Sequence, residues 1–197
     1  MIWSEASIGR ALALQFFNRK YLCVVPNCNW TGHECDLLAV TENLRIIDVE
    51  IKISRGDLKA DAKKDKWWHS YYTGEYQTVV SKSGFSRQDP VRAIDPRPWP
   101  PKVWKHYFAL PKEIWTPDLL DVLPNTNSGI LLLDKDGYPR PVDELMKVTC
   151  LRRATPNRDA KPISPAAAVN IARLASLRMW DAYRKVERLQ GVPGRAA

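Results

Sequence analysis

The sequence predicts an α/β protein, because helical and strand patterns both occur in long apolar segments. Apolar residues recur at the helical period over 5–18 and again over 164–189. Residues 34–40 and 45–54 are instead apolar runs with the period of two that is typical of strands. A chain of 197 residues is long enough for one domain with its own core.

The first helix is expected to begin after Ser4, whose hydroxyl can accept hydrogen bonds from the free amides of a first turn. Three apolar residues recur along one face of this helix: Ile8, Leu12 and Phe16. Glu5 falls on the same face, so the spacing predicts a carboxylate that points along the core-facing stripe. A surface glutamate that only stabilises the helix dipole is the alternative, and the sequence leaves both open.

The segment 45–54 carries charges within an apolar strand. With a period of two, its apolar side chains share one face, and Asp48, Glu50 and Lys52 share the other. Only a short turn separates this segment from the preceding one, so the two are predicted to form an antiparallel hairpin that brings Asp36 near Glu50. Buried carboxylates need a partner, a proton or a metal ion. Mg²⁺ or Mn²⁺ would suit these oxygen ligands, and a polar face in solvent is the alternative.

The charge balance favours a polyanionic partner. Lysine and arginine number 30 against 22 acidic residues, and the net charge of +8 and pI near 9.4 point to nucleic acid before a membrane. No apolar run approaches the roughly 20 residues needed to cross a bilayer. The four cysteines are irregularly spaced and follow no signal peptide, so we expect a reduced, cytoplasmic protein without a zinc site.

The middle of the chain is predicted to contain a charged helix and a basic insertion. The helix begins near Asp57 and continues towards Trp67 and His69. Residues 74–101 are rich in glycine and proline and are interpreted as a loop, with a short strand at 77–81. Basic residues of this loop alternate with aromatic ones, a combination that suits contact with a nucleic-acid backbone and its bases. A solvated loop is the alternative.

The last third of the chain is predicted to add two strands and a long helix. The strands lie at 104–110 and 128–133, with a short helical piece at 117–123 between them. The long helix begins at Ser164 and has a basic surface, which suits solvent as well as DNA. Asp134 begins a turn that resembles the start of a calcium loop, but the remaining ligands of such a loop are missing.

A longer motif connects the Glu50 strand to the residues that follow it. The sequence runs Glu50-Ile51-Lys52, then Ser54-Arg55-Gly56-Asp57-Leu58-Lys59-Ala60-Asp61, then Lys64-Asp65-Lys66-Trp67 and His69. This order resembles the PD-(D/E)XK nuclease superfamily, and within it the bacterial MmcB-related DNA repair group and similar phage proteins. The likeness continues through 106–111 and 128–134 and covers about residues 5–154. Repeated lysines before Trp67 and the insertion at 74–101 depart from the pattern.

The resemblance implies a restriction-endonuclease-like core, in which a central mixed β-sheet is flanked by helices. Residues 1–154 would form this core, including the insertion, and residues 155–197 would form a linker and a basic amphipathic C-terminal helix. Ser54 and Asp57 would hold the turn between strand and helix by local hydrogen bonds.

The resemblance also implies a metal-dependent centre. The metal ligands for Mg²⁺ or Mn²⁺ would be Glu5, Asp36, Glu50 and the backbone carbonyl of Ile51. Lys52 would orient and help to deprotonate the attacking water. The residues expected to contact DNA are Lys64, Lys66, Arg87 and Arg92. Secondary candidates, as neighbours of the ligands or as bases, are Glu34, Asp48, His33, His69 and His106.

The function implied by the resemblance is a metal-dependent nuclease that hydrolyses DNA phosphodiester bonds in repair, recombination or phage DNA processing. Two alternatives stay open. One is a nuclease-like fold that binds branched or single-stranded DNA without cutting it, and the other is an assembly protein that acts through its C-terminal helix. DNA is the expected partner rather than a membrane, and a homo-oligomer is left open.

Overall fold

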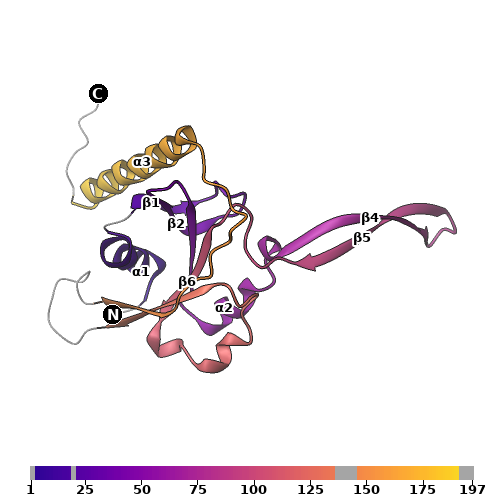
Figure 1. Ribbon diagram of the computed structural model, residues 1–197, viewed down its shortest axis with the longest axis horizontal. Coiled ribbons are helices and arrows are strands. Elements are labelled where there is room, and N and C mark those ends of the chain that lie inside the picture. The colour runs from indigo at the N-terminus through magenta and orange to yellow at the C-terminus, as the bar shows by residue number, and fades with distance from the viewer. Residues whose placement is uncertain (1–2, 19–20, 136–145, 191–197) are drawn as a thin grey trace.

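A six-stranded mixed sheet lies at the centre of the molecule, with the strand order β1-β2-β3-β6-β7-β8 (Figure 1). The structure is a computed structural model that describes residues 3–18, 21–135 and 146–190. The strands of the sheet are β1 Tyr21–Cys28, β2 Cys35–Thr41, β3 Ile46–Ile51, β6 Lys105–Pro111, β7 Gly129–Lys135 and β8 Met146–Arg152. The helices are α1 Glu5–Ala11, α2 Arg55–Asp61 and α3 Pro165–Leu189, so the α/β class is confirmed.

The strand pairing confirms the predicted hairpin. β2 runs antiparallel to β3, with Leu38 opposite Asp48. The parallel strands β3, β6 and β7 follow side by side, and β1 and β8 close the two edges in antiparallel fashion. β1 includes Pro26 and Asn27, and β8 was not among the strands predicted from the sequence.

The two faces of the sheet are covered by different helices. α1 and the π-helical turn Leu12–Phe16 that extends it pack against one face, where Ile47, Val49 and Ile51 project from β3. Ser4 caps α1 by accepting a hydrogen bond from the Ser7 amide at 3.1 Å, as predicted. On the other face α2 and the start of α3 cover two further apolar clusters. The alternation predicted for residues 45–54 is therefore confirmed over β3, whereas Ile53 lies beyond the end of the strand and is exposed.

α2 ends at Asp61, earlier than predicted. The chain turns at 62–64 and forms one 3₁₀ turn over Asp65–Trp67. A continuous helix would point Lys64 and Lys66 to roughly opposite sides, because residues two apart are about 200° apart around a helix. The break allows both lysines to reach the same buried carboxylate, which explains why the predicted helix to Trp67 and His69 does not form.

The predicted Gly- and Pro-rich loop is a long β-hairpin instead. β4 spans Trp68–Val80 and β5 spans Ser86–Pro96, and within the part of the chain that the structure describes they pair only with each other. Figure 1 shows the hairpin extending away from the sheet. Gly84 in its turn has a φ of +81°, which glycine adopts without strain. Pro90 is tolerated because a two-stranded ribbon leaves outward backbone positions unpaired.

The long C-terminal helix packs on the sheet through its first third. Ala168 and Ile171 are buried against β1 and β2, whereas Leu177, Trp180 and Tyr183 are exposed. Among the described residues, no helix is long and apolar enough to cross a membrane. The 117–123 piece forms a 3₁₀ helix over Pro117–Leu120, and the turn predicted from Asp134 lies largely outside the described residues.

Candidate active site

Asp36 lies where β2 and β3 part. The last backbone pair between the two strands joins Leu37 and Val49. Beyond it, Asp36 Oδ2 accepts a hydrogen bond from the Ile51 amide at 2.7 Å, so the carboxylate takes the place of a backbone partner. The Lys52 amide remains paired with β6 through the Ala109 carbonyl at 2.9 Å. The aspartate therefore has a fixed position beside the end of β3.

Glu50 projects from β3 onto the face opposite α1 and is fully buried. Its Oε1 accepts from Lys66 Nζ at 2.5 Å, and its Oε2 accepts from Lys52 Nζ at 2.8 Å and Lys64 Nζ at 3.2 Å. Lys52 and Lys66 are each 2% exposed, whereas the Lys64 side chain is 49% exposed. Three ammonium groups thus converge on one carboxylate, and only Lys64 also reaches solvent.

Asp61, the last residue of α2, completes this cluster. Its Oδ1 lies 3.0 Å from Lys52 Nζ and 2.8 Å from Lys64 Nζ. Trp67 Nε1 donates to Asp61 Oδ2 at 3.0 Å and holds that carboxylate from the other side. Lys52 is therefore fixed between two buried carboxylates, Glu50 and Asp61, which is the arrangement that a buried ammonium requires.

The charges in the cluster stabilise one another in their ionised forms. Burial would raise the pKa of Glu50, but the ammonium groups of Lys66 and Lys52 outweigh it and lower that pKa to about 2. Burial would likewise lower the pKa of Lys52, yet Glu50 and Asp61 raise it above its usual value. Lys52 in this state is a permanent cation, so it suits a role as an orienting and charge-stabilising group.

Asp36 has the opposite electrostatic environment. Burial and the neighbouring Glu50 carboxylate raise the pKa of Asp36 to about 6, although the hydrogen bond from Ile51 lowers it in part. Glu5 also contributes to this rise, so its charge is felt at Asp36. The ionised form of Asp36 is thus disfavoured in the protein alone. A cation bound beside it would stabilise that ionised form.

A second buried polar group lies behind Glu50 on the same face. His106, opposite Asp48 in the parallel pair, has its Nδ1 2.9 Å from Ser128 Oγ and its Nε2 3.9 Å from Asp48 Oδ2. Burial and the nearby Lys66 lower the pKa of His106 well below its usual value, so the imidazole is neutral. Within the described residues Asp48 Oδ1 has no hydrogen-bond partner, and burial raises the pKa of Asp48 to about 7.

The Asp48→Asn variant is expected to lose the part of the pH dependence of the free energy of unfolding that Asp48 causes. Asp48 takes up its proton near pH 3.8 in the unfolded chain and near pH 7 in the folded one. The folded state binds more protons between these values, so stability falls as the pH rises from about 4 to 7 and stays low above 7. Asparagine removes this loss, and the variant should gain up to a few kcal/mol relative to wild type at pH 8.

Urea unfolding of both proteins from pH 4.5 to 8.5 measures this difference, with Asp121→Asn as the exposed control. A difference between Asp48→Asn and wild type that stays constant over the whole range would contradict a buried, titrating Asp48.

The structure brings together the central residues that the sequence predicted. Glu50 and Lys52 form an ion pair, and Asp36 accepts from the amide of Ile51 between them, close enough for both charges to act on its pKa. Glu5 is exposed at the first residue of α1 and does not face the core, because α1 packs through Ile8 and Ala11 instead. Ser54 caps α2 by accepting from the Asp57 amide at 3.1 Å, as predicted.

Of the residues predicted to contact DNA, the two lysines lie in the Glu50 cluster and the two arginines lie on the hairpin. Lys66 is buried with its ammonium on Glu50, so contact with DNA would require it to leave that carboxylate. Lys64 reaches both the cluster and solvent. Arg87 and Arg92 lie on the projecting hairpin, and so does His69. The contacts of Asp61 with Lys52 and Lys64 were not predicted, although Asp61 belongs to the motif, because the sequence does not show that α2 ends there.

Asp36 and Glu50 supply some, but not all, of the ligands that a single Mg²⁺ or Mn²⁺ would need. Such an ion commonly uses one or two carboxylates and keeps several waters, and Asp36 and Glu50 can supply two. Within the ranges that the structure describes, no three His, Cys, Asp or Glu side chains gather as a ligand group. Both Glu50 oxygens already bind ammonium groups, so an ion could share Glu50 only where the half-exposed Lys64 gives way.

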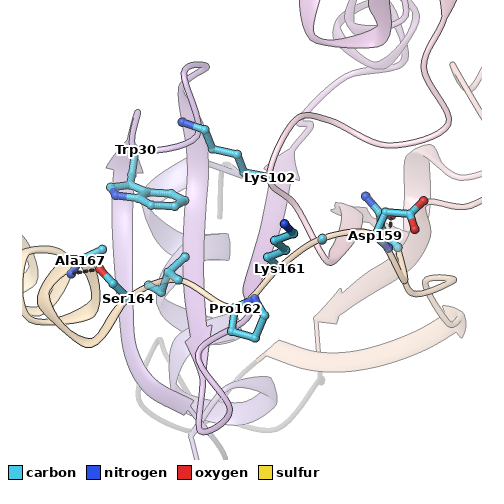
Figure 2. A pocket seen from close by; sticks show the side chains of 10 residues that line it. Trp30, Lys102, Asp159, Lys161, Pro162, Ser164 and Ala167 are labelled. Atoms are coloured by element: carbon cyan, nitrogen blue, oxygen red, sulfur yellow. Dashed lines mark hydrogen bonds between the residues drawn. The ribbon is translucent and has the colours of Figure 1, made fainter.

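A separate hollow of about 500 Å³ lies at the start of α3 (Figure 2). Lys102 lies 5.2 Å from the Trp30 ring at one side, and the segment from Asp159 to Ala167 forms the other. None of the residues of the Glu50 cluster lines it. It is therefore a surface feature distinct from the candidate site.

Comparison with known proteins gives no functional assignment. No family model matches the sequence, and no curated protein matches it. Among solved structures, this protein is similar to a protein of unknown function from Silicibacter pomeroyi, with a TM-score of 0.49 and 17% sequence identity. That similarity covers 96% of this chain and 92% of the other.

Proposed function

We propose that this protein is a metal-dependent nuclease that hydrolyses phosphodiester bonds in DNA. One observation carries the proposal: Asp36, Glu50 and Lys52 lie together where β2 and β3 part, and Lys52 is fixed between two buried carboxylates. Buried charges of this kind cost stability unless they are well paired, so they are characteristic of sites with a chemical task. The net charge of +8 supports a polyanionic substrate.

The order of the elements supports the restriction-endonuclease-like core that the motif implies. α1 precedes the antiparallel strands β1, β2 and β3, and a helix and the parallel strand β6 follow. The proposed centre lies at the end of β3 in this arrangement. The likeness to PD-(D/E)XK nucleases, and to the MmcB-related group within them, remains part of the proposal.

Each residue of the centre has a defined task in the proposed reaction. Asp36 and Glu50 would hold Mg²⁺ or Mn²⁺, which lowers the pKa of a bound water and neutralises charge on a nonbridging phosphate oxygen. Lys52 orients the attacking water and stabilises the charge that develops on the phosphorus oxygens. Asp61, held by Trp67, keeps Lys52 in position. Lys64 contacts Asp61 and is also open to solvent, so it can bind a phosphate group that approaches the cluster.

The Asp36→Asn variant tests the proposal by two readouts. Plasmid, single-stranded and branched DNA are incubated with the protein in Mg²⁺ or Mn²⁺, and Mn²⁺ binding is measured by calorimetry without DNA. We expect the variant to lose cleavage by at least about 100-fold and to bind Mn²⁺ more weakly, because asparagine carries no negative charge. Asp121→Asn, at an exposed aspartate outside the Glu50 cluster, is the matched control and should behave as wild type.

Absence of cleavage of every DNA substrate by the wild-type protein would overturn the nuclease proposal. Cleavage that Asp36→Asn leaves unchanged would show that another site, or a contaminant, is responsible.

Binding of DNA without cleavage is the second candidate function. The observation that favours it is the full engagement of Glu50 by Lys52, Lys64 and Lys66, which leaves a metal ion little room. A protein that binds DNA equally well with and without divalent cations, and never cuts it, would have this function.

A further inference from the structure

The β4–β5 hairpin has two chemically different faces. Residues paired across the ribbon share a face, and successive residues alternate between faces. The aromatic face, as we define it, consists of Trp68, Ser70, Tyr72, Tyr76, Thr78 and Val80 of β4 with Ser86, Gln88, Pro90, Arg92, Ile94 and Pro96 of β5. The opposite face includes His69, Tyr71, Gln77, Arg87, Asp89 and Asp95.

The aromatic face exposes large flat side chains. Trp68 is 41% exposed, Tyr72 58% and Tyr76 69%. Tyr72, Tyr76 and Pro90 line one shallow hollow at the irregular step of the ribbon, so they lie on the same side; Gly74 and the exposed Glu75, which belong to that step, complete the lining. A two-stranded ribbon has no core of its own and gains little stability from such residues. Their exposed rings are therefore available to stack against a ligand.

At the paired positions of the ribbon the charges are distributed unequally between the two faces. Asp89 pairs with Arg87, and Asp95 accepts from the Tyr71 hydroxyl. Both carboxylates of β5 therefore lie on the opposite face. Arg92 is the charged residue among the paired positions of the aromatic face, and its guanidinium lies 4.8 Å from the Tyr72 ring. Stacking surfaces next to a cation are complementary to a base and its phosphate.

The aromatic face begins beside the candidate active site. Trp68 follows Lys66 by two residues, and Lys66 binds Glu50. The Arg97 amide donates to the Trp67 carbonyl at 2.7 Å, which closes the base of the hairpin. A hollow of about 560 Å³ at this base is lined by Asp65, Trp68, Ser70 and Ile94. A chain that lies along the aromatic face therefore leads towards the residues around Glu50.

We propose that the aromatic face of the hairpin binds single-stranded DNA, with bases stacked on Trp68, Tyr72 and Tyr76 and a phosphate on Arg92. A duplex conceals the faces of its bases, so stacking of this kind selects unpaired strands. A β-ribbon that reads the major groove instead needs polar side chains that are free to bond base edges, whereas on this face Gln88 Nε2 already donates to Thr78 Oγ1 at 2.9 Å. That the ligand is DNA rests on the proposed function. The hairpin adds to that function the form of DNA that is bound, a single strand.

Fluorescence anisotropy with a labelled 15-nucleotide oligo(dT) tests the proposal on the full chain. EDTA is present throughout, so cleavage cannot affect the result. The Tyr72→Ala/Tyr76→Ala double variant should weaken binding by at least about 5-fold, and up to about 150-fold for each lost stack. Tyr71→Ala, a tyrosine of the opposite face, is the matched control and should stay within twofold of wild type.

Three outcomes would overturn the proposal. The first is a double variant that binds oligo(dT) within twofold of wild type, or that loses no more affinity than Tyr71→Ala. The second is a 15-base-pair duplex that binds as tightly as the single strand. The third is a dimer of the wild-type protein, seen by light scattering, that the double variant dissociates, because the face would then be an interface between two copies. Circular dichroism verifies that each variant is folded.

The two proposals fail separately. A protein that binds oligo(dT) through the aromatic face but never cuts DNA contradicts only the nuclease. A protein that cuts DNA but binds it independently of Tyr72 and Tyr76 contradicts only the role of the hairpin.

Discussion

Replacing Lys66 by methionine is expected to lower the free energy of unfolding by about 3–5 kcal/mol. Lys66 Nζ is the partner that the structure gives Glu50 Oε1, at 2.5 Å, and both side chains are buried. Methionine fills the volume of the lysine stem but leaves this oxygen without a donor in a region of low dielectric. The fall is therefore the cost of an uncompensated buried charge, and urea unfolding at pH 7 measures it.

Lys63→Met is the control for this measurement. Lys63 belongs to the same turn but is exposed, so its replacement should change stability by no more than about 0.5 kcal/mol. Equal unfolding midpoints for Lys66→Met and Lys63→Met would show that Lys66 does not compensate Glu50.

Replacing Lys52 by alanine is expected to lower the rate of DNA cleavage by at least about 100-fold, if the protein is the nuclease we propose. This is the range found when one preorganised donor or proton-transfer group is removed from an active site. Single-turnover cleavage at saturating enzyme separates this loss from weaker binding of DNA.

Lys59→Ala, an exposed lysine of α2, is the matched control for Lys52→Ala. Because Lys52 also bridges Glu50 and Asp61, its loss destabilises the fold, so unfolding of the variant has to be measured alongside cleavage. A folded Lys52→Ala protein that cleaves at the wild-type rate would remove Lys52 from the reaction.

The centre of the sheet could be predicted because local rules decide it. A period of two and a short turn are sufficient to pair β2 with β3 and to place Asp36 near the end of β3. Ser4 and Ser54 cap their helices because hydroxyl side chains satisfy free amides within three residues. None of these features depends on distant parts of the chain.

The elements that could not be predicted depend on distant contacts. α2 ends after Asp61 because Lys64 and Lys66 bind a carboxylate on β3, and no pattern within 55–69 records that requirement. The hairpin was interpreted as a loop because Gly74, Gly84 and Pro90 are typical of loops. In a twisted two-stranded ribbon these residues occupy an irregular step, a turn and an edge position, where they cost little.

The hydrogen bond between the Arg97 amide and the Trp67 carbonyl has a consequence for the length of the hairpin. The chain leaves the core and returns to it at neighbouring points, so the entropic cost of closing the excursion depends only weakly on its length. The hairpin can lengthen, shorten or change its sequence while the Glu50 cluster keeps its geometry. Shortening the arm therefore changes its reach from the core without a large cost to the stability of that core.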